Sequence, residues 1–197
     1  SLPNANRDYL LAALVRGLAT HDPDAALDLL LKSPASPERT GSLDFILNAW
    51  SQISLEHAFQ KLPTTGPLKA QAIQKLTATL TRDQFVPART WAQALTDPSD
   101  RQSALTGIAA RWSQSDPVAA TAWAASLADP QTQSLALGET ATRWARRDPA
   151  AASAWLAENP NSPTLDLAAR SIAASTIGLD PAQAFSQIAT ITHAPLR

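Results

Sequence analysis

The sequence repeats itself at a fixed interval. The segment 111–123 begins with Arg-Trp, passes through Asp-Pro-x-Ala-Ala and ends on Trp, and the segment 143–155 does the same in register, a period of 32. Self-similarity at a fixed period of about 20 to 50 residues is typical of repeat proteins, in which one small unit recurs and stacks on its neighbours. Every other signal in the chain has to fit this period.

Helix-start signals recur at the position of Asp116. Asp is favoured as an N-cap because its carboxylate accepts a hydrogen bond from the free N–H groups of the first turn. Pro suits the first helical position, where its missing N–H is not needed. We therefore expect a helix, called helix B, to begin at each equivalent position. Spaced by 32, 30, 32, 32 and 32, these positions are Asp22, Ser54, Gln84, Asp116, Asp148 and Asp180.

A second start signal lies between successive members of the first series and predicts a longer helix, called helix A. The first A helix is expected from Asn6 to Thr20, and the later ones begin at Ser36-Pro37, Pro67-Leu68, Asp97-Pro98, Asp129-Pro130 and Ser162-Pro163. The sequence thus predicts an all-α fold of twelve helices in one domain, 1–197, with repeats near 4–34, 35–65, 66–96, 97–128, 129–161 and 162–197.

The third repeat departs from the pattern. Its B helix reads Gln84-Phe85-Val86-Pro87 in place of Asp-Pro-x-Ala, and the spacing before it is shorter by two. We expect a turn of different shape there, or a local change in the superhelix.

Apolar residues on the predicted helices recur at offsets of 0, 3, 4 and 7, which form one helical face. In the fourth A helix these are Leu105, Ile108, Ala109 and Trp112. One position of helix B is alanine in every repeat, which predicts that helices cross closely there. Its members are Ala26, Ala58, Ala88, Ala120, Ala152 and Ala184.

Composition narrows the possible functions. The chain carries 16 basic and 17 acidic residues, a net charge of -1, without the basic excess of a nucleic-acid binder. No apolar run approaches the roughly 20 residues that span a bilayer, so we expect no membrane insertion. Cysteine is absent, which excludes disulfides and thiolate zinc sites. The chain begins at Ser1 without Met, as either a trimmed or a mature fragment would; export with a removed signal, a cytoplasmic location and the oligomeric state are all left open.

The paired helices, the period near 32, the helix-B alanine and the Pro at each helix-A start resemble tetratricopeptide-like repeats. The interval from Pro130 to Ala152 equals the family's interval between its turn Pro and its helix-B Ala. The family period is 34, and the Trp-x-x-Leu-Gly-x-x-Tyr signature is missing. Asp-Pro-x-Ala-Ala-x-x-Trp also resembles Trp-rich helical repeats of large exported bacterial proteins. The resemblance implies a right-handed superhelix that binds proteins or peptides, without a cofactor.

Candidate catalytic groups are sparse. His21, His57 and His193 do not pair at metal-ligand spacing, so we interpret them as structural and expect no metal. Most aspartates are explained as caps, and the other carboxylates, including Glu139 and Asp166, are scattered along the chain. An α/α-barrel hydrolase would need two of them facing each other. We therefore predict a non-catalytic protein- or peptide-binding scaffold. The alternatives are a structural segment of a larger exported multirepeat protein and, less favoured, an α/α hydrolase.

A partner is expected to contact the inner face of the third to fifth A helices. Small residues there leave room for a bound segment, and Arg111 and Arg143 occupy one position on successive helices. These arginines either stabilise helix ends through the helix dipole or hold an acidic side chain. Most of the six Trp residues are interpreted as core. The full set of candidate partner-binding residues is Arg111, Arg143, Trp112, Trp144, Glu139, Asp166 and Arg170.

Overall fold

The structure is a computed structural model that describes residues 4–34, 37–63, 67–159, 165–178 and 181–182. These residues form eleven α-helices and one 3₁₀ helix, and none of them lies in a strand. The all-α prediction is confirmed. Twelve helices were expected, and the twelfth, from Asp180, falls almost wholly outside the described residues, together with Ala184 and His193. None of the described helices combines the length and apolarity needed to cross a bilayer.

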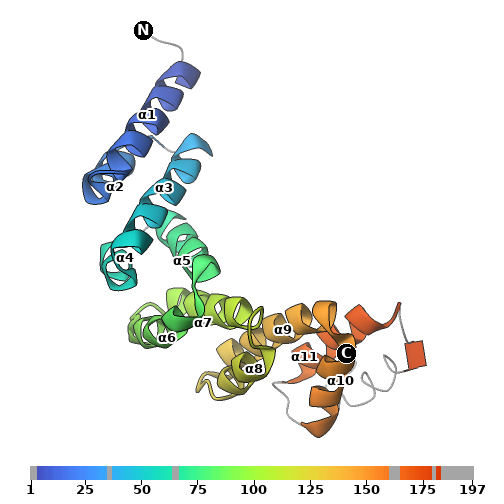
Figure 1. Cartoon of the computed structure of the whole chain (residues 1–197). Helices are drawn as coiled ribbons and strands as arrows, with labels where there is room; N and C mark the ends of the chain where they lie inside the picture. Colours follow the sequence, from blue (N-terminus) through green and yellow to red (C-terminus); the bar gives the residue numbers. More distant parts are fainter. Residues whose placement is uncertain (1–3, 35–36, 64–66, 160–164, 179–180, 183–197) are drawn as a thin grey trace.

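Longer and shorter helices alternate along the chain, as the two start signals predict (Figure 1). The A helices are α1 (Asn4–Ala19), α3 (Pro37–Ile53), α5 (Pro67–Thr79), α7 (Pro98–Trp112), α9 (Pro130–Arg147) and α11 (Asp166–Thr176). The B helices are α2 (Pro23–Leu31), α4 (Leu55–Lys61), α6 (Phe85–Ala94), α8 (Pro117–Ala125) and α10 (Pro149–Glu158). The last A helix begins at Asp166, whereas Ser162 and Pro163, its expected start, lie outside the described residues.

Side-chain N-caps hold six of these helix starts. In each, a side-chain oxygen accepts the backbone N–H three residues on, at 2.8–3.0 Å. Each such cap stabilises its helix by about 1 kcal/mol. The hydrogen bond from the backbone N–H of Asp100 also lowers the pKa of Asp97. The predicted capping residues are confirmed at Asp22, Ser54, Asp97, Asp116, Asp129 and Asp148.

The third pair has the differently shaped turn that its sequence predicts, and α6 begins where expected, with Gln84 as its N-cap residue but without a side-chain cap hydrogen bond. A 3₁₀ helix, Arg82–Gln84, precedes α6, and Gln84 is its last residue. The side chain of Gln84 folds back, so that its Oε1 accepts the backbone N–H of Thr81 at 3.0 Å. Thr81 is therefore the N-cap of the 3₁₀ helix, three residues before the N-cap of α6.

The helices stack into a curved arc. Each A helix packs against the next one along the chain, and α2, α6, α8 and α10 each also pack against the A helix of the following pair. Figure 1 shows the A helices from α3 to α9 on the inner side of the arc and the B helices on the outer side. The arc changes direction between α5 and α7, next to the irregular turn.

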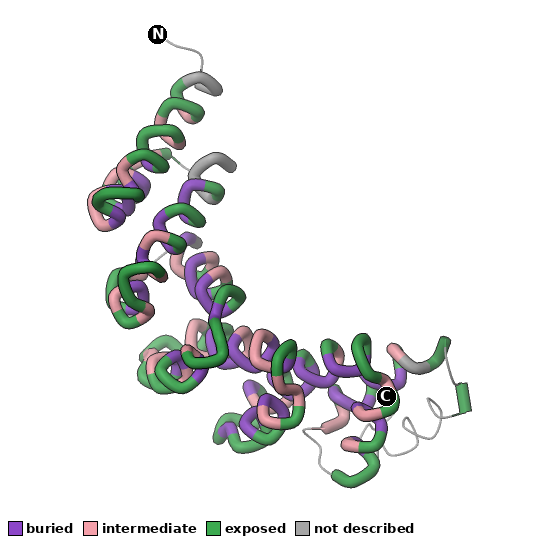
Figure 2. Tube along the Cα trace, in the orientation of Figure 1, coloured by how far each residue is buried: buried purple, intermediate pink, exposed green. Residues whose placement is uncertain are grey.

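The core lies between the two rows of helices, as the buried segments in Figure 2 show. The described members of the predicted helix-A ladders are buried from the second pair onward, apart from a half-buried Trp112. Trp50 is fully buried, and the ring of Trp91 stacks on Phe59 with centroids 4.0 Å apart. The core interpretation of the tryptophans is confirmed. The alanine position of helix B is 0% exposed at Ala26, Ala58, Ala88, Ala120 and Ala152.

Enlarging this alanine is expected to destabilise the stack. Ala120→Leu and Ala152→Leu force extra methyl groups between close backbones, at a cost of about 1–3 kcal/mol each through overpacking. Ala122→Leu is the matched control, because Ala122 is an exposed alanine of the same helix as Ala120. Urea denaturation should show lower midpoints for the first two variants only. Parent-like midpoints for all three would contradict the close crossing.

Candidate functional site

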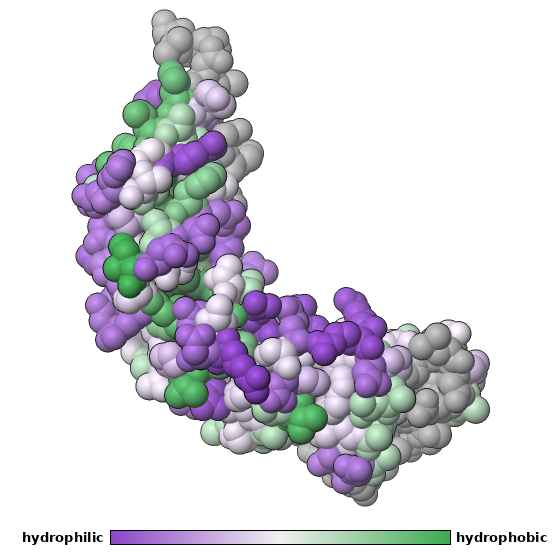
Figure 3. Space-filling view, viewed as in Figure 1, coloured by the Kyte–Doolittle hydropathy of each residue, from purple (hydrophilic) through white to green (hydrophobic). Residues whose placement is uncertain are grey.

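A groove crosses the inner faces of α5, α7 and α9. Its volume is about 660 Å³, and it opens on the hollow side of the arc, where Figure 3 shows mainly hydrophilic surface. The groove combines small, amide-bearing and charged side chains. Its lining residues are Ala70, Gln71, Gln74, Thr77, Ala78, Gln102, Ser103, Thr106, Gly107, Ala110, Arg111, Gln114, Leu135, Glu139 and Arg143.

Close helix packing forms the floor of this groove. A Cβ atom on Gly107 would clash with the hydroxyl oxygen of Thr77, so glycine lets α7 approach α5 this closely. The Thr77 hydroxyl donates instead to its own helix, to the carbonyl of Ile73 at 2.9 Å. Backbone and short side chains therefore line the groove where α5 and α7 meet.

Arg111 is bound to the end of the preceding A helix. Its Nε donates to the carbonyl of Leu80 at 2.9 Å, directly after the last residue of α5, and Nη1 donates to Gln114 Oε1 at 2.6 Å. A cation is favoured there because the carbonyl end of a helix carries partial negative charge. Of the two roles predicted for this arginine, the structure shows the contact to a helix end.

Arg143 occupies the same position one period later but has different partners. Its Nη2 lies 3.6 Å from Glu139 Oε2, one turn earlier on α9, and both side chains are about half exposed. Such surface pairs contribute roughly 0.2–1 kcal/mol. Arg143 can therefore exchange Glu139 for another carboxylate at little cost.

The difference between the two arginines follows from the carbonyl that each could reach. The equivalent of Leu80 in the next pair is Trp112, whose carbonyl already accepts the backbone N–H groups of Ser115 and Asp116, both at 3.0 Å. In the third pair the corresponding N–H, that of Gln84, binds Thr81 instead. The carbonyl of Leu80 is thus left for the guanidinium of Arg111.

Glutamine side chains in the groove are a feature that sequence reasoning missed. Gln71, Gln74, Gln102 and Gln114 each offer two donor hydrogens and an acceptor oxygen. Within the described part of the chain, Gln71 Oε1 and the Thr106 hydroxyl are buried without a hydrogen-bond partner. The only available signal was that Gln71, Gln74 and Gln102 stand outside the apolar ladders of their helices.

Trp112 and Trp144 do not line the groove. Trp112 lies 5.3 Å from Phe85 and 5.8 Å from Trp123, measured between ring centroids, and Trp144 lies 6.1 Å from Trp155. Both rings therefore face the B helices. One residue along a helix is a rotation of about 100°, which turns them away from the neighbouring arginines.

The two predicted residues of α11 are also separate from the groove. Asp166 and Arg170 are not among the residues that line it. Of the seven predicted partner-binding residues, the structure brings together Arg111, Glu139 and Arg143.

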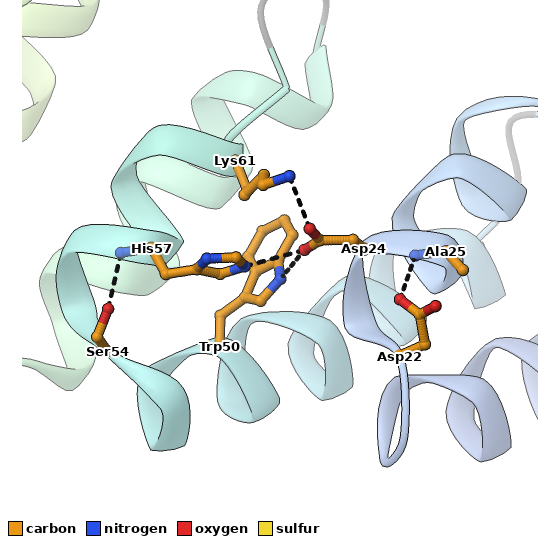
Figure 4. A network of polar contacts seen from close by, with 7 residues as sticks. All are labelled: Asp22, Asp24, Ala25, Trp50, Ser54, His57 and Lys61. Carbon is orange, nitrogen blue, oxygen red and sulfur yellow. Dashed lines mark hydrogen bonds and ion pairs between the residues drawn. The ribbon is translucent and has the colours of Figure 1, made fainter.

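A second polar cluster joins the first two helix pairs (Figure 4). Asp24, the second residue of α2, accepts a hydrogen bond from Trp50 Nε1 at 2.8 Å. Its Oδ1 also lies 3.0 Å from His57 Nε2, and its Oδ2 lies 2.7 Å from the Lys61 ammonium. Both carboxylate oxygens are thus bound by the second pair, so the cluster fastens one pair to the next. The structural interpretation of His57 is confirmed, although its partner lies in the preceding repeat.

The contacts of Asp24 shift its titration. The hydrogen bond and charge of Lys61, with hydrogen bonds from His57 and Trp50, lower the pKa of Asp24 from 3.8 to about 2, against a smaller opposing effect of burial. Asp24 in turn raises the pKa of Lys61. Among the described residues, no group of three or more His, Cys, Asp or Glu side chains is placed to hold a metal ion.

Asp24→Asn is expected to weaken this junction. A lowered folded-state pKa stabilises the fold above the unfolded pKa of 3.8 and loses that contribution as the pH falls through about 2. Because the Asp24 side chain is 38% exposed, solvent screening reduces the contribution to about 1 kcal/mol. Urea midpoints of parent and variant should differ at pH 7 and converge near pH 2. Asp28→Asn, an exposed carboxylate on the same helix, is the control and should match the parent throughout.

Arg111→Ala and Arg143→Ala form a matched pair for stability. Losing Arg111 leaves the carbonyl of Leu80 without its partner, at a cost of about 1–3 kcal/mol, whereas losing Arg143 breaks only a surface pair. Thermal and urea unfolding should show a clear loss for Arg111→Ala and little change for Arg143→Ala. Equal losses would mean that the Leu80 contact does not distinguish the two sites.

Comparison with known proteins assigns no family to this chain. No family model, curated protein or solved structure matches it. The groove on α5, α7 and α9, and the cluster around Asp24, are therefore interpreted from their own geometry and chemistry.

Proposed function

We propose that the chain is a non-catalytic protein- or peptide-binding scaffold, a right-handed superhelix of tetratricopeptide-like hairpins that binds its partner on the inner face. The observation that carries this proposal is the groove across α5, α7 and α9. A groove that runs across stacked helices suits an extended chain, because it offers similar contacts at regular intervals.

The size of the groove fits a short peptide segment. Packed helices lie about 8–10 Å apart, so three of them span about 16–20 Å. An extended chain rises about 3.3 Å per residue, so five or six residues cross this distance. The groove's volume of about 660 Å³ also lies within the common range of ligand sites.

The lining chemistry favours a peptide with at least one acidic side chain. The amides of Gln71, Gln74 and Gln102 can pair with the N–H and C=O groups of an extended backbone. Arg143 supplies a planar donor group for a carboxylate and is held only by a surface pair with Glu139. Small residues such as Ser103 and Gly107 leave space for the segment.

The same lining supports binding rather than hydrolysis. Glu139 is the one carboxylate among the described residues that line the groove, and it is paired with Arg143. Glycoside hydrolysis requires two carboxyl groups on opposite sides of the reacting bond. The geometry thus favours the scaffold over the α/α hydrolase.

The proposal is tested by selecting peptides from a random displayed library on the purified chain. Binders should carry an acidic residue, and Arg143→Ala should weaken them at least about tenfold, because a lost charge-assisted hydrogen bond costs about 1.5–3 kcal/mol. Fluorescence polarisation with labelled peptides measures the affinity.

Two tryptophan variants locate the site. Ser103→Trp fills the groove from an exposed position of α7 and should abolish binding, whereas Ala122→Trp, at an exposed position of α8, should leave it unchanged. Peptides that bind Ser103→Trp as tightly as the parent would place the site elsewhere. A selection that yields no groove-dependent binder would count against the scaffold role.

A further inference from the structure

The first A helix carries an apolar surface, here called the end face, formed by Leu10 and Leu14. These side chains are 49% and 64% exposed. Figure 3 shows hydrophobic surface at this end of the arc. The exposure is not a property of α1 as a whole, because Val15 and Ala19 on the same helix are 0% and 1% exposed.

Every later A helix buries the positions equivalent to Leu14 and Leu10. The equivalents of Leu14 are at most 1% exposed; they are Ile46, Leu76, Ile108, Thr140 and Ile172. The equivalents of Leu10 are at most 3% exposed; they are Ser42, Ala72, Ala104, Ala136 and Ala168. Both positions are therefore buried in every later A helix. At the position of Leu14 the later helices carry mostly residues of similar size, whereas at the position of Leu10 they carry alanine or serine.

The preceding helix pair provides this burial in the rest of the stack. Both α1 and α2 pack against α3, and both α7 and α8 pack against α9. Gly107 shows which side of α7 faces the preceding pair, because a Cβ atom at Gly107 would contact Thr77 of α5, the preceding A helix. Gly107 directly precedes Ile108, an equivalent of Leu14. The end face is thus the side of α1 on which a preceding pair would lie.

We propose that the end face docks an amphipathic helical hairpin, which stacks on α1 as α1 and α2 stack on α3. The side of an A helix that meets the next pair carries small residues, because Thr77 of α5 lies where a Cβ atom on Gly107 of α7 would be, and the later equivalents of Thr77 include Ala109 and Ala141. The large side chains of Leu10 and Leu14 would insert against such a side. The partner's contact surface is therefore expected to be rich in alanine, serine and threonine.

The end face of a second copy of this chain would fit against the first end face less well than such a hairpin. Two end faces in contact would set leucines against leucines, without the small residues that receive them elsewhere in the stack. The end face also lies on α1, apart from the groove on α5, α7 and α9, so the two inferences are independent.

The test adds one hairpin to the intact chain. A second copy of residues 97–129, which contain α7 and α8, is placed directly before Ser1, and hydrogen exchange of the α1 amides is followed by mass spectrometry. Docking should slow exchange in α1 at least tenfold. Leu14→Asp should cancel this gain, while changing exchange in the unextended chain less than twofold. Val86→Asp, a 61% exposed residue of α6, is the control and should preserve the gain.

If α1 exchanges at the same rate with and without the added hairpin, or if the gain survives Leu14→Asp, the end face does not dock hairpins. Sedimentation velocity of the unextended chain tests whether a second copy of the chain occupies the end face instead. Dimers that Leu14→Asp dissociates would assign the end face to a second copy and overturn the proposal.

Discussion

No helix pair in this chain can bury its own apolar side chains, and the structure depends on that constraint. A single pair such as α3 and α4 is too thin to enclose Leu43, Ile46 or Trp50 unless its neighbours close over them. The apolar side chains are fully buried because neighbouring helices approach each other closely. The 0% exposure of Ala120 and Ala152 shows helices meeting where a methyl group fills the space. The inner groove and the end face are consequences of how this stacking proceeds and where it stops.

The features that repeat were predictable from the sequence because local chemistry determines them. An Asp followed by Pro fixes a helix start through contacts within one turn, so Asp116 and Asp148 could be assigned without a structure. The buried alanine position of helix B could also be predicted, because alanine at all six equivalent positions indicates that a larger side chain does not fit there. The third turn was recognised as irregular, but its 3₁₀ helix depends on how far the Gln84 side chain reaches back, which spacing does not reveal.

The features that occur once were not predictable. The sequence places Asp24 only as an acidic residue in the first turn of a helix. Its contacts with Trp50, His57 and Lys61 form when the second pair packs against α2. The later equivalents of Asp24 include Val86 and Val118, so no period signals the cluster. The candidate groove was predicted in part. Arg143 and Glu139 line it, but Trp112 and Trp144 turn to the core because each is the next residue around the helix from its arginine.

The irregular turn in the third pair determines the contact of Arg111, one of the residues that line the groove. The 3₁₀ helix that begins after Thr81 takes up the backbone N–H of Gln84, whose equivalent in the other described pairs binds the end of the preceding A helix, and the carbonyl of Leu80 then binds the guanidinium of Arg111. That contact ties α7 to the end of α5 at the place where the arc changes direction (Figure 1). One period later the turn is regular, the carbonyl of Trp112 is occupied, and Arg143 stays at the surface. Two arginines at one sequence position thus differ in their contacts: Arg111 is bound to the end of α5, whereas Arg143 makes only a surface pair with Glu139.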